Sequence, residues 1–150
     1  MIIISPWSRS LDGGNPNPKC PKEEWWRRLV SLIHEPIIQV GVLGELHVVS
    51  SENVRHSLSL HDLGLLVDQC RTWISVDTFF QHYAWDRGKY GIVIFGQSNP
   101  KIFGHPENIN LLKGEEYLMP DQFLTWNQVP YRDDVFVEPE EVVKHLNEFR

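Results

Sequence analysis

Short apolar runs are the clearest feature of the hydrophobic pattern. Residues 2–4, 37–43, 73–76 and 91–96 are wholly or mostly apolar, and polar or turn-forming residues follow each run. Apolar runs of this length without a polar alternation are typical of strands that are buried on both faces of a parallel sheet. We therefore expect buried strands at these four places.

Helical periodicity appears between and after these runs. Behind Pro21, apolar residues recur at helical spacing at Trp25, Trp26, Leu29, Leu32 and Ile33. Ser59 is placed to cap a second helix, with Asp62 at the acidic position of a capping box and an inward stripe of Leu60, Leu63, Val67 and Cys70. Residues 78–87 predict a third helix that Gly88 would end, and Pro139 suits the first turn of a fourth.

Strands that alternate with helices predict an α/β fold, here a single Rossmann-like domain with a mostly parallel sheet covered on both faces. Residues 108–123 follow no clear period. The 150 residues are enough for one such domain and too few for two, so we assign 1–150 to one domain. The hydrophobic share of 41% separates the chain from disordered sequences.

Charge and composition exclude several classes of protein. The formal net charge of -6 argues against nucleic-acid binding through bulk charge. The sequence has no apolar run long enough to span a bilayer, and the apolar start at residues 1–4 is too short for a signal peptide. Cys20 and Cys70 form no C-x-x-C pair, so we expect reduced thiols in a cytoplasmic protein.

Several catalytic motifs are missing from the sequence. It contains no G-x-G-x-x-G, no G-x-x-x-x-G-K-[ST] and no G-x-S-x-G, which argues against dinucleotide dehydrogenases, P-loop enzymes and α/β hydrolases. None of the seven histidines falls into H-E-x-x-H. We therefore expect neither a metal site nor a cofactor.

Polar residues follow each predicted strand, where parallel sheets bind their ligands. The best of these places is Asp77–Thr78, because a helix that begins directly after a strand presents unpaired N–H groups that suit a diphosphate. His82 follows about one and a half turns later and could stay near the same mouth. The alternative is that Asp77 only caps the helix and His82 is a core histidine.

The segment 74–100, ISVDTFFQHYAWDRGKYGIVIFGQSNP, resembles the signature of glycosyltransferase family 9, the ADP-heptose:lipopolysaccharide heptosyltransferases. In that family a strand ends in S-x-D-T-G-x-x-H, a helix ends in G-K, and a strand leads into F-G-x-[ST]-x-P. Lys19 before the first helix and Glu45 after the second strand are similar to a lysine and a glutamate of the family. The resemblance covers nearly the whole chain, but only the C-terminal half of the family.

This resemblance implies the donor-binding domain of a GT-B glycosyltransferase, with a nucleotide diphosphate sugar as ligand and an ADP-sugar favoured. It implies that Lys19 and Asp77–Thr78 contact the phosphates, that Glu45 holds the ribose, and that His82 lies near the phosphates as a candidate for catalysis. Two more residues complete the predicted binding set, Ser5 and Phe79. Lys22 could take the part of Lys19, and Glu45 could be only a surface charge.

Two departures from the family affect the prediction. The glycine that follows Asp-Thr in the family is Phe79 here, and its side chain could narrow the phosphate site or stack on the ligand. The N-terminal acceptor domain, which supplies the activating carboxylate in the family, has no counterpart in the 150 residues. We therefore expect an acceptor-domain protein or a second copy of the chain as partner, on a face that carries Trp7 and Phe79. Trp7 and Trp126 are candidates for stacking on a ligand.

The missing acceptor half leaves three functional hypotheses. The chain is the donor half of an inverting glycosyltransferase, a non-catalytic module that binds a nucleotide or nucleotide sugar, or an interaction domain with an empty pocket.

Overall fold

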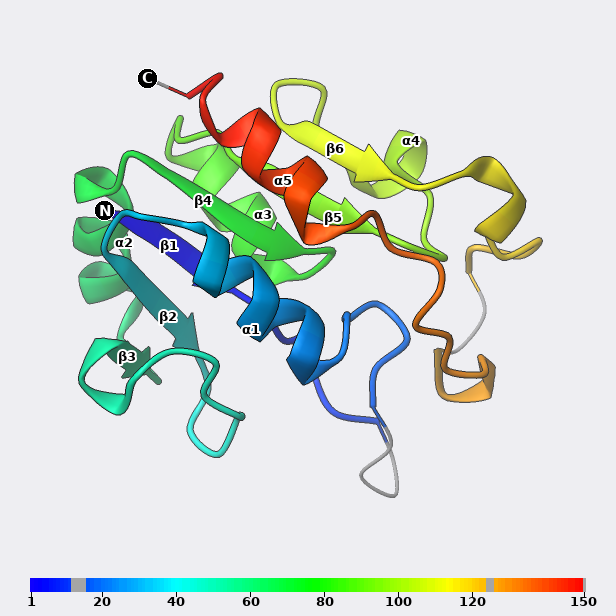
Figure 1. Ribbon diagram of the computed structural model, residues 1–150, viewed down its shortest axis with the longest axis horizontal. Coiled ribbons are helices and arrows are strands. Elements are labelled where there is room, and N and C mark those ends of the chain that lie inside the picture. The colour runs from blue at the N-terminus through cyan, green and yellow to red at the C-terminus, as the bar shows by residue number, and fades with distance from the viewer. Residues whose placement is uncertain (12–15, 124–125, 150) are drawn as a thin grey trace.

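A computed structural model describes residues 1–11, 16–123 and 126–149. In this part of the chain six strands form one parallel sheet (Figure 1), in the order β3-β2-β1-β4-β5-β6. The strands are β1 (Ile2–Ser5), β2 (Ile37–Gly41), β3 (Val54–His56), β4 (Thr72–Val76), β5 (Ile92–Phe95) and β6 (Ile109–Leu112). This is the strand order of the Rossmann fold, so the predicted α/β class is confirmed.

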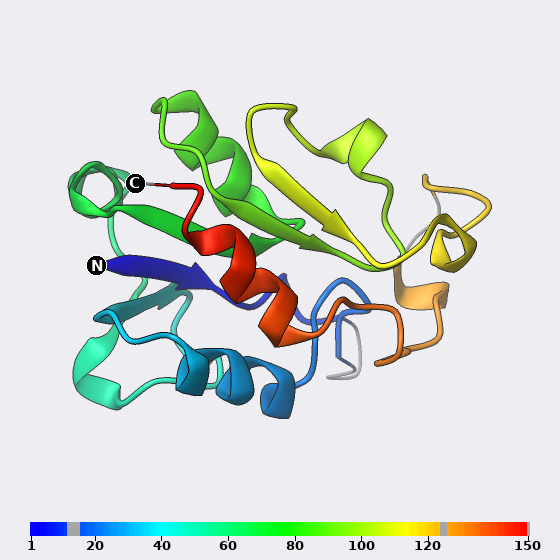
Figure 2. The same ribbon diagram turned by 45° about the horizontal axis from the view of Figure 1, so that its top comes forward.

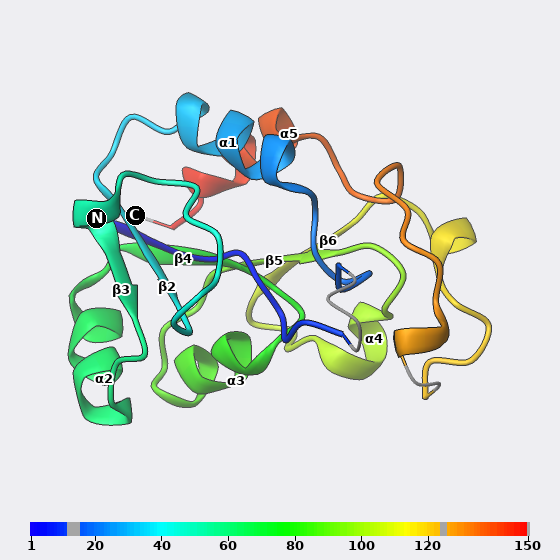
Figure 3. The ribbon, with the colours of Figure 1, turned by 90° about the horizontal axis from the view of Figure 1, so that it is seen from below.

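Helices cover both faces of the sheet, as Figure 3 shows. On one face α1 (Glu23–Leu32) and α5 (Pro139–Leu146) lie side by side (Figure 2). The other face carries α2 (Leu60–Gln69), α3 (Phe79–Asp86) and the short α4 (Pro100–Phe103). The loops also contain the 3-10 helices η2 (Ser51–Asn53), η3 (Glu115–Tyr117) and η4 (Trp126–Gln128). None of the helices in the described ranges is long and apolar enough to cross a membrane.

Two hydrophobic clusters, one on each face, hold the layers together. Ile2 and Ile4 join the cluster under α1 and α5, whereas Ile3 joins the cluster under α2 and α3. All three side chains are fully buried, because alternate residues of a central strand point to opposite faces. Trp26 and Trp73 are also fully buried, whereas Trp25 and Trp85 are only partly buried.

The predicted helix ends are also confirmed. Ser59 caps α2, since its hydroxyl accepts a hydrogen bond from the Asp62 N–H at 3.1 Å. Gly88 follows α3 with a φ of +75°, a left-handed conformation that glycine adopts without strain. Pro139 opens α5, where its missing N–H costs no hydrogen bond.

Some elements differ from the sequence predictions. The strands β3 and β6 lie at the two edges of the sheet and are only partly buried, so their sequences lack the continuous apolar run of a central strand. The second strand ends at Gly41, and Leu43 beyond it is 85% exposed. Leu60 is 61% exposed, so its predicted inward position in α2 is wrong: as the first residue of the helix it lies at the rim of a cavity.

The sheet has its topological switch point between β1 and β4. The chain moves outward from β1 through β2 to β3, then returns to β4 and moves outward on the other side to β6. Loops from the carboxyl ends of β1 and β4 therefore diverge, and ligands of open α/β sheets bind in the crevice between them. Ser5 and Ser75 are paired across this junction.

Candidate functional site

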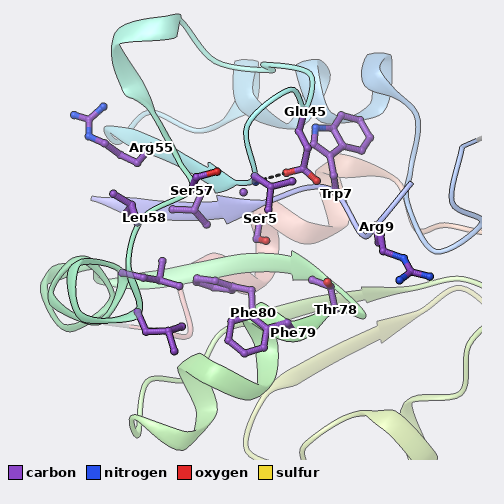
Figure 4. A pocket seen from close by; sticks show the side chains of 15 residues that line it. Ser5, Trp7, Arg9, Glu45, Arg55, Ser57, Leu58, Thr78, Phe79 and Phe80 are labelled. Carbon is purple, nitrogen blue, oxygen red and sulfur yellow. Dashed lines mark hydrogen bonds between the residues drawn. The ribbon is translucent and has the colours of Figure 1, made fainter. Parts of the chain in front are cut away.

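A cavity of about 410 Å³ lies beyond the carboxyl ends of β1, β2 and β4 (Figure 4). Four of the residues predicted for the binding site line it, namely Ser5, Glu45, Thr78 and Phe79. Much of the remaining wall is apolar and comes from β2, the loop before α2, α2 and α3, including Val40, Leu58, Leu63 and Phe80. We call this space the apolar cavity.

Two further cavities adjoin the apolar cavity along the segment between β1 and α1. Trp7 and Glu45 also line a space of about 460 Å³ near the start of α1. Arg9 also lines a space of about 320 Å³, which it shares with Lys19 and Trp126 and which we call the lysine cavity. Arg9 therefore lies where the apolar and lysine cavities meet.

The turn from β4 to α3 holds an ion pair between the buried Asp77 and the partly buried Lys19. Asp77 is 4% exposed, and its Oδ1 accepts a hydrogen bond from Gln81 Nε2 at 2.8 Å. The other oxygen, Oδ2, lies 3.2 Å from Lys19 Nζ and is not hydrogen-bonded. Thr78, not Asp77, is the N-cap of α3, and no side chain caps the helix there. The alternative role of Asp77 as a simple cap is therefore wrong.

Lys19 is enclosed on several sides. Its ammonium group lies 5.0 Å from the ring centre of Trp126 and 5.7 Å from that of Phe103, in addition to its pairing with Asp77. Lys22 has different surroundings, because it pairs at 2.8 Å with Asp133 and both side chains are half exposed. Of the two lysines that the sequence left open, the structure brings Lys19 to the β4–α3 turn.

Glu45 folds back on the turn that follows β2. Its Oε1 accepts a hydrogen bond from the Val42 N–H at 2.8 Å. Burial raises the pKa of Glu45, and the Val42 hydrogen bond opposes this rise. The carboxylate is half-buried and lines two cavities, so its surroundings are not those of an isolated surface charge.

His82 is exposed, and the alternative of a core histidine is wrong. Its Nδ1 lies 2.7 Å from Nε2 of His105, which is in the loop between α4 and β6. Partial burial lowers the pKa of His82, the nearby His105 and Lys19 lower it further, and Asp77 opposes them.

The two aromatic residues predicted on this face differ in exposure. Phe79 is 58% exposed, and its ring lies 5.6 Å from the ring of Tyr83. Trp7 is half-buried, and its indole N–H donates to the Leu46 carbonyl at 2.8 Å. Trp7 therefore forms a fixed wall between two cavities, whereas Phe79 is accessible to a ligand or a partner.

Several residues of this region were not predicted from the sequence. Gln81 has a signal that could have been used, because it lies one helical turn from Asp77 and contacts it. Arg9, Phe103 and His105 lie in or next to loops without a period, and only the tertiary structure brings them to the site. Within the described ranges, no group of three or more His, Cys, Asp or Glu side chains could hold a metal ion.

Neither protein-family profiles nor curated protein sequences match the chain. Solved structures do resemble it. The E. coli ADP-heptose lps heptosyltransferase II aligns over 99% of this chain and 45% of its own, with a TM-score of 0.70 and 14% identity. The E. coli heptosyltransferase WaaC with ADP aligns over 99% of this chain and 44% of its own, with a TM-score of 0.62 and 17% identity. WaaC with ADP-2-deoxy-2-fluoro heptose aligns over 98% of this chain and 42% of its own, with a TM-score of 0.63 and 16% identity.

The chain spans less than half the length of each of these proteins. At such low identities the likeness is one of fold. The chain has the Rossmann-like α/β fold of a domain found in the heptosyltransferases.

Proposed function

We propose that this chain is the donor-binding domain of a GT-B glycosyltransferase and binds a nucleotide diphosphate sugar at the crevice between β1 and β4. The observation that carries the proposal is the Lys19–Asp77 pair at the uncapped start of α3. There a cation and the positive end of a helix lie next to two cavities. Similarity in fold to proteins solved with ADP and with an ADP-heptose analogue favours an ADP-sugar.

The diphosphate would lie where the apolar and lysine cavities meet. Lys19 and the N–H groups at the start of α3 would bind its oxygens, and Arg9 lies close enough to both cavities to add a second cation. Asp77 cannot donate to a phosphate while it is ionised. Its role is instead to hold the Lys19 ammonium group in position, as their 3.2 Å separation supports.

The nucleoside would occupy the apolar cavity. Its walls suit the faces of a base, and such cavities bind small ligands through a few fixed polar groups. Glu45, at the edge of the cavity, would accept hydrogen bonds from the ribose hydroxyls. Phe79 would lie against the nucleoside or the diphosphate, at the place where the family has a glycine.

The proposed reaction is an inverting transfer of the sugar to an acceptor hydroxyl. Negative charge develops on the leaving diphosphate, and Lys19 and the α3 N-terminus would stabilise it. The acceptor site and the base that activates the hydroxyl would come from an acceptor-domain protein or from a second copy of the chain.

Calorimetry with ADP and ADP-heptose, followed by a transferase assay with and without the products of neighbouring genes, tests the proposal. We expect binding of both ligands, and turnover only with the partner. Tight binding without turnover in any combination would favour the second hypothesis, a module that captures nucleotide sugars. Failure to bind either ligand would contradict both hypotheses.

A further inference from the structure

A pair of histidines lies beside the proposed phosphate site, and the sequence motif accounts for only one of them. His82 is on α3, and His105 is in the loop before β6. The two rings are nearly perpendicular, with 2.7 Å between His82 Nδ1 and His105 Nε2. This distance is that of a hydrogen bond between the ring nitrogens.

His105 is held in place independently of His82. Its ring stacks on Trp85 with 4.2 Å between the ring centres and an angle of 10°. The Trp85 indole N–H in turn donates to Glu107 at 3.0 Å, and the His105 carbonyl accepts from Asn110 at 2.9 Å. His105 is therefore a fixed support against which the more exposed His82 ring can be oriented.

The pair can present the same donor in two charge states. When both rings are neutral and His105 Nε2 donates, His82 Nδ1 accepts and the proton of His82 is on Nε2. When His82 gains a second proton, its Nδ1 donates and His105 Nε2 accepts, which requires the proton of neutral His105 to be on Nδ1. In both states His82 Nε2 carries a proton that it can donate to an anion.

Among the residues that the structure describes, the charged groups around the pair are Lys19, Asp77 and Glu107. Lys19 and His105 lower the pKa of His82, as does burial, while Asp77 opposes them. Glu107 contacts the pair only through Trp85. A bound diphosphate would add negative charge near Asp77, and this charge would act in the same direction as Asp77 and favour the protonated state.

We propose that His105 is the positioning residue for His82, and that the pair takes up a proton when a nucleoside diphosphate binds. This inference rests on the proposed function. The proton comes from solvent and is shared between His82 Nδ1 and His105 Nε2, while His82 Nε2 donates to a phosphate oxygen. In a transfer reaction the pair would thus offset the charge that develops on the departing diphosphate.

Calorimetry of ADP binding near pH 7, in buffers with different ionisation enthalpies, measures this proton uptake directly. We expect the unmodified chain to take up a fraction of a proton and to lose affinity for ADP as the pH rises.

His105→Phe keeps an aromatic ring on Trp85 but removes the ring nitrogens. This variant should abolish the proton uptake and weaken ADP binding about threefold to tenfold. His105→Gln, whose amide can still hydrogen-bond to His82, should recover part of the affinity without the uptake.

His34→Asn is the matched control, because His34 is exposed and lies between α1 and β2. It should bind ADP with unchanged affinity and unchanged proton uptake. ADP binding without proton uptake, or with the same uptake in His105→Phe, would overturn the inference and leave the proposed function standing. If ADP does not bind at all, both the inference and the proposed function are contradicted. Nitrogen-15 spectra of the histidine rings in the free protein check separately that His82 Nδ1 and His105 Nε2 share a hydrogen bond.

Discussion

Lys19 and Lys22 are three residues apart in one loop, but only Lys19 lies beside the β4–α3 turn. We expect Lys19→Met to weaken ADP binding by about tenfold to a hundredfold, because a hydrogen bond to a charged group contributes about 1.5–3 kcal/mol. Lys22→Met is the control and should change the affinity less than about twofold. Calorimetry with ADP measures both, and equal losses in the two variants would contradict the assignment.

The proposed role of Asp77 has a sharper test in a double-mutant cycle. Asp77→Asn removes the charge but keeps an oxygen that can accept from Gln81. If Asp77 acts through Lys19, the double variant should bind ADP no more weakly than Lys19→Met alone. Additive losses would instead mean that Asp77 contacts the ligand by a separate route.

The sequence predicted correctly that a helix begins directly after the strand at residues 77–82, because this junction is a local feature. The partners of these residues are not a local feature: only the family resemblance named Lys19 for the same site, and nothing in the sequence named His105. Lys19 reaches Asp77 across 58 positions, and His105 reaches His82 across 23. Both come from loops whose paths depend on how the whole sheet is assembled.

At the scale of the elements, Gly88 ends α3 in a left-handed conformation. A Cβ atom built there meets nothing within 4 Å, so only the backbone would oppose a side chain. We expect Gly88→Ala to lower the free energy of unfolding by about 1 kcal/mol. Gly88→Asn should cost less, since asparagine tolerates this conformation better. Urea denaturation measures both, and equal losses would point to a cause other than backbone strain.

Arg71 joins three elements near the amino ends of the strands. It donates to Glu35 before β2 and, at 2.9 Å, to the Leu146 carbonyl at the end of α5. Its hydrogen bond lowers the pKa of Glu35 below the ordinary value of 4.5, against the opposing effect of burial. A carboxyl group whose pKa is lower in the folded than in the unfolded chain stabilises the fold at pH values above its pKa in the unfolded chain. This stabilisation is lost as the pH falls through its pKa in the folded chain.

Glu35→Gln should therefore reduce stability near pH 7 and lose that difference below about pH 4. The free energies of unfolding of both proteins, measured across this range, test the expectation. A difference that stays constant down to the lowest pH would show that the Glu35 charge has no part in it.

The position of a strand in the sheet explains whether its sequence made it predictable. The four predicted strands are β1, β2, β4 and β5, which are central in the sheet and carry wholly or mostly apolar runs. The edge strands β3 and β6 have one neighbour each and carry polar residues such as Arg55 and Asn110. An edge strand needs less apolar sequence, so the pattern that identified the centre of the sheet was not present there.

At the scale of the whole molecule, the rim of the apolar cavity exposes several apolar side chains. Their exposed fractions are 60% for Val42, 61% for Leu60 and 58% for Phe79. Side chains of this kind gathered around a cavity are typical of a ligand or partner surface. We expect an acceptor-domain protein or a second copy of the chain to cover this rim when the donor is bound.

Phe79→Ala is the better variant for this test, since Trp7→Ala would also remove the wall between two cavities. It should weaken both assembly and ADP binding, because the same ring would contact the partner and the ligand. Tyr90→Ala is the control, as Tyr90 is 39% exposed and lies just before β5, at the amino ends of the strands and away from the cavity. Sedimentation with and without ADP measures the assembly. A chain that stays monomeric at high concentration with ADP bound, and in which Phe79→Ala changes only affinity, would mean that the rim serves the ligand alone.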